Sequence, residues 1–178
     1  MDVFYHLDST GVSLEADKIL ELISITLEGK PKDEVRHKIR FPEGLSHFGD
    51  DIIHGRLKPL ALDREKEVER VRRAKYSYRQ SRYISVFGCK KIEDIERLRN
   101  TLFPPWDNGP RGRIWKVKGD ATFHSDMKCF ETYCYDNTAA ADAYWSQEAS
   151  EKPLVEYLLK PPVTVLHEVL GHPYSPDS

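Results

Sequence analysis

Two segments of the chain repeat apolar residues at the spacing of one helix face. Residues 63–78 consist of good helix formers and place Val68 and Tyr78 along one side. Residues 92–103 gather their apolar side chains on one face and run into two consecutive prolines, which disfavour a continuing helix. We therefore expect a helix in each segment, and a third, shorter helix that begins with Thr138 as its N-terminal cap.

Other segments carry the β-branched and aromatic residues or the alternation that is typical of strands. The pattern predicts strands at residues 3–6, 81–87, 113–118 and 128–135, and a hairpin-like pair at 155–159 and 163–169. Residues 18–27 are apolar enough for a helix or a strand, and their periodicity does not decide between the two. Helices and strands mix without strict βαβ alternation, which favours an α+β domain over a doubly wound one.

Size and composition indicate one ordinary domain. The 178 residues, 39% of them hydrophobic, suffice for a single core, so we expect one domain over residues 1–178. No apolar run approaches the roughly 18 residues of a membrane span, and the first ten residues do not resemble an export signal. The three cysteines are not closely paired, which suits free thiols. We expect a cytoplasmic protein.

Charge is nearly balanced, with a net charge of −2. This balance argues against a protein that binds nucleic acid over its whole surface, but leaves room for a local basic patch. The C-terminal half of the expected helix 63–78 holds such a cluster, which with nearby tyrosines would suit phosphate contacts and base stacking. The alternative is a solvated helix whose basic groups pair with its own glutamates. The candidate nucleic-acid-binding residues are Arg70, Arg72, Arg73 and Lys75.

The histidines, cysteines and glycines do not have the spacings of the common metal and nucleotide motifs. His167 and His172 stand five residues apart, whereas the zinc-protease helix needs four. Cys129 and Cys134 do not match zinc-ligand spacings either. The chain has no glycine-rich phosphate loop of the Rossmann or Walker type. We predict no metal site, and any nucleotide must be held in another way.

Three dispersed pieces remain, each unremarkable by itself: residues 4–6 (Phe-Tyr-His), 81–87 (Ser-Arg-Tyr-Ile-Ser-Val-Phe) and 156–162 (Glu-Tyr-Leu-Leu-Lys-Pro-Pro). In this order they resemble the ADP-ribosyltransferase superfamily, in the His-containing branch that includes the poly-ADP-ribose polymerases and rifampin-modifying enzymes. The whole chain is also similar to a bacterial family with a domain of unknown function and to anti-phage toxins that ADP-ribosylate nucleic acid.

The resemblance implies an ADP-ribosyltransferase-like fold, a split β-sheet core with flanking helices, and NAD as the substrate. It implies that Glu156 is the catalytic carboxylate, stabilising the positive charge that develops on the ribose as nicotinamide leaves. The implied NAD-binding residues are His6 and Tyr5 at the first strand, Leu7 through its main chain, Tyr83 or Phe87 against the nicotinamide, Ser85 at its amide, and Arg82 at the pyrophosphate.

Departures from the family pattern narrow the expected reaction. Leu7 replaces the glycine that usually follows the histidine, and helix-anchored alignment would put Val86 at the central tyrosine position in place of Tyr83. Leu154 stands where enzymes that modify arginine have Glu or Gln, which makes transfer to arginine unexpected.

The resulting hypothesis is a mono-ADP-ribosyltransferase that modifies a macromolecule, with RNA favoured by the basic helix. Because an enzyme that consumes NAD endangers its own cell, we also expect a toxin or defence role with a neutralising protein partner. The alternatives are an NAD glycohydrolase, with water as the acceptor, and a non-catalytic binding module on the same fold.

Overall fold

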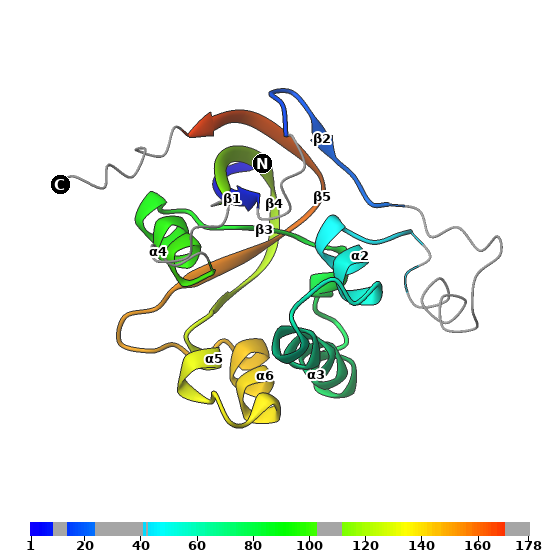
Figure 1. Cartoon of the computed structure of the whole chain (residues 1–178), viewed down its shortest axis with the longest axis vertical. Helices are drawn as coiled ribbons and strands as arrows, with labels where there is room; N and C mark the ends of the chain where they lie inside the picture. The colour runs from blue at the N-terminus through cyan, green and yellow to red at the C-terminus, as the bar shows by residue number, and fades with distance from the viewer. Residues whose placement is uncertain (9–13, 24–40, 42, 103–111, 170–178) are drawn as a thin grey trace.

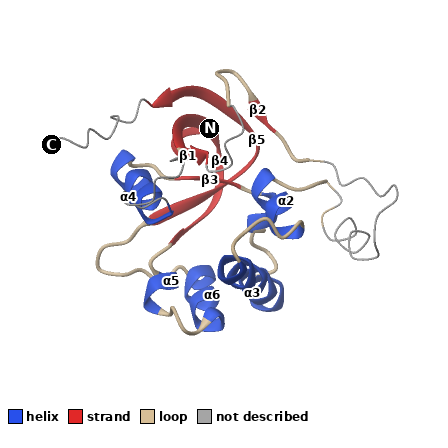
Figure 2. Cartoon of the chain, viewed as in Figure 1, coloured by secondary structure: helices blue, strands red, loops and turns tan. Residues whose placement is uncertain are grey.

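The computed structural model describes residues 1–8, 14–23, 41, 43–102 and 112–169. Its centre is an antiparallel sheet of five strands in the order β1-β4-β5-β2, with β3 pairing β5 beside this path (Figures 1 and 2). The strands are β1 (Asp2–Asp8), β2 (Ile19–Leu20), β3 (Val86–Gly88), β4 (Arg113–Asp126) and β5 (Val155–Val169).

The long strands β4 and β5 pair along most of their length and carry the shorter strands on their outer edges. β1 pairs with the first half of β4, while β3 and β2 pair with successive parts of β5. Tyr5 of β1 and Cys89, the residue after β3, exchange both main-chain hydrogen bonds at 2.8 Å. β1, β4, β5 and β3 are therefore linked in a ring.

Helices cover the sheet from several sides (Figures 1 and 2). They are α2 (His47–Ile53), α3 (Pro59–Lys75), the 3₁₀-helix η1 (Arg82–Ile84), α4 (Ile92–Leu102), α5 (Cys129–Thr132) and α6 (Asn137–Ser146). α3, α5 and α6 gather together and bury one aromatic core, in which the Trp145 indole donates a 2.8 Å hydrogen bond to the Val68 carbonyl. α4 packs its apolar face beside β1.

The fold is α+β, as the mixed order of elements predicts. The expected helix at 92–103 and strand at 113–118 are present as α4 and the first part of β4. The expected helix at 63–78 is present as α3, with Val68 and Val71 buried. It ends at Lys75, however, and Tyr78 lies beyond it with 78% of its surface exposed.

Two expected strands are wrong, and short-range side-chain bonds explain both. In residues 81–87 the Ser81 hydroxyl accepts from the Tyr83 amide and starts η1, so that only Val86 onward is strand. Residues 128–135 begin with helix α5, because the Asp126 carboxylate accepts from the Lys128 amide and turns the chain at once.

The expected hairpin at 155–169 is also wrong, since β5 is one continuous strand. Pro161 and Pro162 fall where the pairing of β5 with β4 is irregular, between the partners of Asp120 and Lys118, so their missing N–H groups cost no ladder bond there. The cap of α6 is Asp136, whose carboxylate accepts from the Ala139 amide, and not Thr138.

The ambiguous segment 18–27 is extended where it is described. It contributes β2, and Ile23 forms a bridge with Leu45. Residues 24–27 lie outside the described residues.

Candidate functional site

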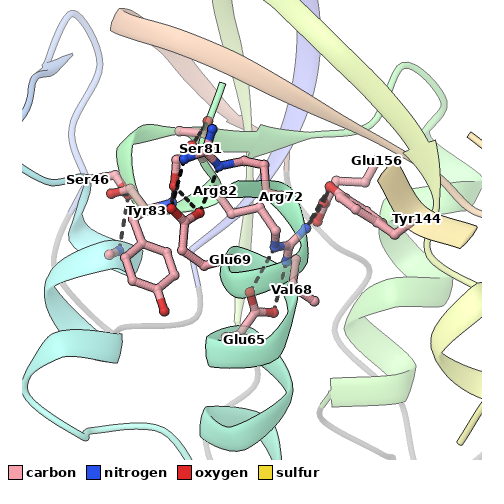
Figure 3. A network of polar contacts seen from close by, with 12 residues as sticks. Ser46, Glu65, Val68, Glu69, Arg72, Ser81, Arg82, Tyr83, Tyr144 and Glu156 are labelled. Atoms are coloured by element: carbon pink, nitrogen blue, oxygen red, sulfur yellow. Dashed lines mark hydrogen bonds and ion pairs between the residues drawn. The ribbon is translucent and has the colours of Figure 1, made fainter. Parts of the chain in front are cut away.

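A cluster of buried charges lies where β5 begins, between the sheet and helices α3 and α6 (Figure 3). The Tyr144 hydroxyl donates to Glu156 Oε1 at 2.7 Å, and Arg82 Nη1 donates both to the Tyr144 oxygen at 2.8 Å and to Glu156. On its other side the Arg82 guanidinium bonds Glu65, with distances of 2.9 Å from Nε and 3.1 Å from Nη2. Arg82 therefore bridges two carboxylates.

Local chemistry holds Arg82 in this position. The Ser81 hydroxyl donates to Glu69 at 2.7 Å and ties η1 to α3, while Glu69 also pairs with Arg72 at 2.8 Å. The Ser85 hydroxyl donates to the Ser81 carbonyl at 2.7 Å and closes the turn. η1 is thus fixed on α3. The Arg82 side chain extends from it toward Tyr144 of α6 and Glu156 of β5 (Figure 3).

The cluster is shielded from water. Exposed fractions are 7% for Glu65, 3% for Arg82, 0% for Tyr144 and 3% for Glu156. Burial raises the pKa of Glu156 above its usual range, against the opposing effects of Arg82 and the Tyr144 hydroxyl. Burial alone would lower the pKa of Arg82, but the two carboxylates hold it well above its usual value.

Aromatic rings form the outer wall of the cluster. The Arg82 guanidinium lies 4.6 Å from the ring centroid of Phe87 and 5.7 Å from that of Phe48, at distances typical of cation–π contacts. The two phenylalanines meet edge to face at 4.7 Å. Both rings are only partly buried, whereas the Arg82 side chain that they contact is buried.

His6 joins the site through the main chain of Phe87. Its Nδ1 lies 2.8 Å from the Phe87 carbonyl oxygen. Burial lowers the pKa of His6, outweighing the effects of this carbonyl and of Asp8 that favour the charged ring, and nearby His47 lowers the pKa further. A carbonyl only accepts, so Nδ1 of the neutral imidazole carries the proton and Nε2 is left as an acceptor.

The structure thus brings the three dispersed sequence pieces into contact. Phe87 touches His6 through its carbonyl and Arg82 through its ring, and Arg82 bonds Glu156. A continuous path of contacts runs from β1 through β3 and η1 to β5.

Other residues expected at an NAD site lie elsewhere or are already bonded. The Tyr83 ring points away from Glu156 (Figure 3) and packs against Phe41 at 5.5 Å. The Ser85 hydroxyl donates to Ser81 and accepts from the Gln80 amide. All three nitrogens of Arg82 bond Glu65, Tyr144 or Glu156, so the guanidinium is not available to a pyrophosphate in this arrangement.

The remaining expected residues line other parts of the core. Leu7 and Tyr5 pack in a separate apolar cluster with the buried face of α4. Leu7 lies opposite Ile114 in the sheet. Val86, the alternative central residue, is buried in the core beside Phe4. Phe87 is therefore the aromatic candidate that faces the charge cluster.

The basic residues of α3 are engaged with acidic partners. The pairs are Arg70 with Glu67 at 2.6 Å, Arg72 with Glu69 at 2.8 Å, Arg73 with Glu69 at 3.5 Å, and Lys75 with Asp142 at 3.0 Å. Arg72 is mostly buried and also donates to the carbonyls of Ser77 and Arg79. The three arginine pairs lie within α3, as the alternative of a self-paired helix predicts, whereas Lys75 pairs with α6. Nucleic-acid binding by these residues stays a prediction.

Sequence reasoning missed Glu65, Tyr144 and Phe48 as members of the site. Glu65 carried a signal, because it stands with Glu69 on the same helix face as buried Val68. Acidic residues on an apolar face need a buried partner. The sequence does not tell which cation supplies it.

Among the described residues, no group of three or more His, Cys, Asp or Glu side chains could hold a metal ion. Cys89 and Cys129 are buried free thiols whose pKa burial raises to about 12, while Cys134 is exposed. His172 lies outside the described residues.

Fold and site together define an α+β protein with a buried Glu–Arg–Glu–Tyr cluster behind an aromatic pair and a neutral histidine. The chain belongs to the family described as "Protein of unknown function (DUF2441)", whose model matches residues 15–171. A search of curated proteins finds no match. Of the helices that the structure describes, none has the length and apolar character to cross a bilayer.

Proposed function

We propose that this protein is an ADP-ribosyltransferase that cleaves NAD, with Glu156 as the catalytic carboxylate. The observation that carries the proposal is the path of contacts from His6 through Phe87 and Arg82 to Glu156. Four of the residues that the superfamily resemblance selects, His6, Arg82, Phe87 and Glu156, are neighbours along this path.

The charge of the cluster suits this chemistry. Loss of nicotinamide leaves positive charge on the ribose, as in glycoside hydrolysis. With Glu65 and Glu156 ionised, the cluster holds two negative charges against the one positive charge of Arg82. A fixed excess of negative charge in a site shielded from water stabilises such a transition state.

The surrounding residues have roles that follow from their contacts. The partly exposed Phe87 ring is the wall for the nicotinamide, and His6 Nε2 accepts from a ribose hydroxyl. Arg82 holds Glu156 in place. Because Glu156 is 3% exposed, substrate binding requires the Phe48–Phe87 pair to separate and open the way to the carboxylate.

The first test measures nicotinamide release and transfer of label from NAD to RNA, DNA and cell lysate. Glu156→Gln keeps the shape of the side chain and removes its charge, so we expect a folded protein with roughly 10²–10³-fold slower release. Glu67→Gln is the control, because Glu67 lies on the same helix as Glu65 and bonds Arg70 and Thr138, neither of which belongs to the charge cluster. Its activity per folded molecule should stay within a few-fold of the wild type.

The outcomes separate the candidate functions. Label on a macromolecule supports a transferase and identifies its acceptor class, with RNA as our proposal. Free ADP-ribose without labelled macromolecule indicates an NAD glycohydrolase. If the wild type releases no nicotinamide, or if Glu156→Gln releases it at the wild-type rate, the proposal is wrong.

A non-catalytic binding module is the second candidate, and one observation favours it. Glu156 is buried and bonded to both Arg82 and Tyr144, as a purely structural carboxylate would be. A protein that binds a partner without consuming NAD under any condition would establish this candidate.

We also propose a toxin or defence role with a neutralising partner protein, resting on the proposed activity. Expression of the wild type in bacteria should then arrest growth and deplete NAD, whereas expression of Glu156→Gln should do neither. Equal growth of both strains at equal protein levels would contradict this role.

A further inference from the structure

The Arg82 guanidinium, with a single positive charge, bonds two buried carboxylates. A buried guanidinium is neutralised by one carboxylate, and Glu156 together with the Tyr144 hydroxyl already supplies that partner. Glu65 adds a second carboxylate with two hydrogen bonds, at 2.9 and 3.1 Å, while being 7% exposed itself. With both carboxylates ionised, one buried negative charge is in excess, and desolvation penalises it.

We infer that Glu65 is a positioning residue that acts through Arg82, holding the guanidinium between two carboxylates so that the cluster as a whole presents a net negative charge to the reacting ribose. This inference rests on the proposed function for its catalytic meaning. Glu65 itself contacts neither the aromatic wall nor His6 in any interaction found among the described residues.

The electrostatic argument compares two arrangements of the same site. If Glu65 were neutral, Arg82 and Glu156 would form a one-to-one pair whose field falls off quickly with distance. With Glu65 ionised, the cluster has a net negative charge, and its attraction for a developing cation is weakly screened in the interior. The geometry agrees, because Glu65 and Glu156 lie on opposite sides of the Arg82 guanidinium (Figure 3).

The groups that act electrostatically on Glu156 come from every element around it. They are Arg82 of η1, Tyr144 of α6, Glu65 of α3, Cys129 of α5 and Cys89 after β3. Burial raises the pKa of both thiols to about 12 and that of Tyr144 well above its usual value, so these three stay neutral near pH 7. Glu65 is therefore the negative charge among them that raises the pKa of Glu156.

The first experiment compares Glu65→Gln with Glu67→Gln in nicotinamide release across pH. We expect Glu65→Gln to lower kcat roughly ten- to a hundredfold with little change in KM. The acid limb of its pH–rate profile should move to lower pH, because removing the negative charge of Glu65 lowers the pKa of Glu156. Glu67→Gln should leave the acid limb in place, and Glu65→Asp should restore part of kcat.

The second experiment does not depend on turnover. Proteins labelled with ¹³C at the glutamate carboxyl carbon are titrated by NMR, and the Glu156 signal is assigned from its absence in Glu156→Gln. We expect its midpoint to fall in Glu65→Gln and to stay unchanged in Glu67→Gln.

The two readouts distinguish the possible failures. No nicotinamide release by the wild type at any pH overturns the proposed function, and the Glu156 midpoint then decides by itself whether Glu65 controls the charge of Glu156. An unmoved midpoint in Glu65→Gln overturns the inference. Equal losses of kcat in Glu65→Gln and Glu67→Gln, with unmoved acid limbs, also overturn it and leave Glu65 a structural residue.

Discussion

Tyr144 shows how one side chain can serve both the core and the charge cluster. Its ring is fully buried and packs against Phe130 and Trp145 with centroid distances of 5.4 and 4.9 Å. Its main-chain carbonyl accepts from the Ser125 hydroxyl at 2.6 Å, and its own hydroxyl is the link between Arg82 and Glu156. The aromatic core thereby fixes the position of a polar atom in the site.

The variant Tyr144→Phe tests this link. It keeps the ring and removes the hydroxyl, so we expect the free energy of unfolding in urea to fall by about 1.5–3 kcal/mol, the usual range for a hydrogen bond to a charged group. The pKa of Glu156 should rise further, because the Tyr144 hydroxyl lowers it. A variant with wild-type stability and an unmoved Glu156 titration would show that the hydroxyl contributes nothing.

At the residue scale the sequence identifies part of the site. His6, Phe87 and Glu156 could be selected from their order and context, and the structure brings them into one path of contacts. Glu65 and Tyr144 could not, because their roles depend on contacts with residues distant in the sequence. Pairing of that kind follows from packing of helices on the sheet, which no local pattern encodes.

Among the elements, α2 packs closely against η1. The Ser46 hydroxyl accepts from the Gly49 amide, which caps α2, and donates to the Tyr83 carbonyl at 3.0 Å. A β-carbon built at Gly49 would lie 2.0 Å from that same carbonyl oxygen. Glycine is therefore required there for α2 to dock on η1 and place Phe48 against Phe87.

Gly49→Ala should separate these two elements. We expect a loss of about 3 kcal/mol in unfolding free energy, at the upper end of the range for overpacking, even though alanine itself favours a helix by about 1 kcal/mol. The comparison variant is Gly55→Ala, which meets no atom within 4 Å but has a φ of 64°. It should cost only about 1–2 kcal/mol. Equal losses in the two variants would contradict the close approach.

Elements were predictable where the periodicity is long and sustained. Helices α3 and α4 and the first part of β4 follow directly from it. The errors fall where one side chain decides the main-chain path: Ser81 starts a 3₁₀ turn and Asp126 starts α5. The prolines in β5 predict a break in the strand, which the structure does not have. The irregular pairing that accommodates them depends on β4 as well, so the sequence of β5 alone does not reveal it.

For the molecule as a whole, the buried cluster affects how stability depends on pH. The pKa of Glu156 is raised above the value of 4.5 expected for an exposed side chain, so the folded protein binds this proton more tightly than the unfolded chain. The stabilisation is complete below the unfolded pKa and is lost as pH rises through the folded pKa. Asp126 and Glu67, whose pKa values are lowered, act in the opposite direction.

Urea unfolding of the wild type and Glu156→Gln between about pH 4 and pH 8 isolates this contribution. Because the variant lacks the titrating group, its stability relative to the wild type should increase as pH rises. The carboxylates with lowered pKa values are present in both proteins and cancel in the difference. A difference that is constant with pH, or that decreases, would contradict the raised pKa of Glu156.

The ring of strands has a consequence for synthesis on the ribosome. β5 provides Glu156 and pairs with β4, β3 and β2, yet it is the last of the described strands to be translated. Contacts between such distant residues also form slowly. A nascent chain that has not yet exposed β5 lacks both the Glu156 carboxylate and the strand that joins the sheet, so under the proposed function a growing polypeptide would be inactive. In a toxin, this delay would separate translation from the onset of activity and leave time for a neutralising partner to bind.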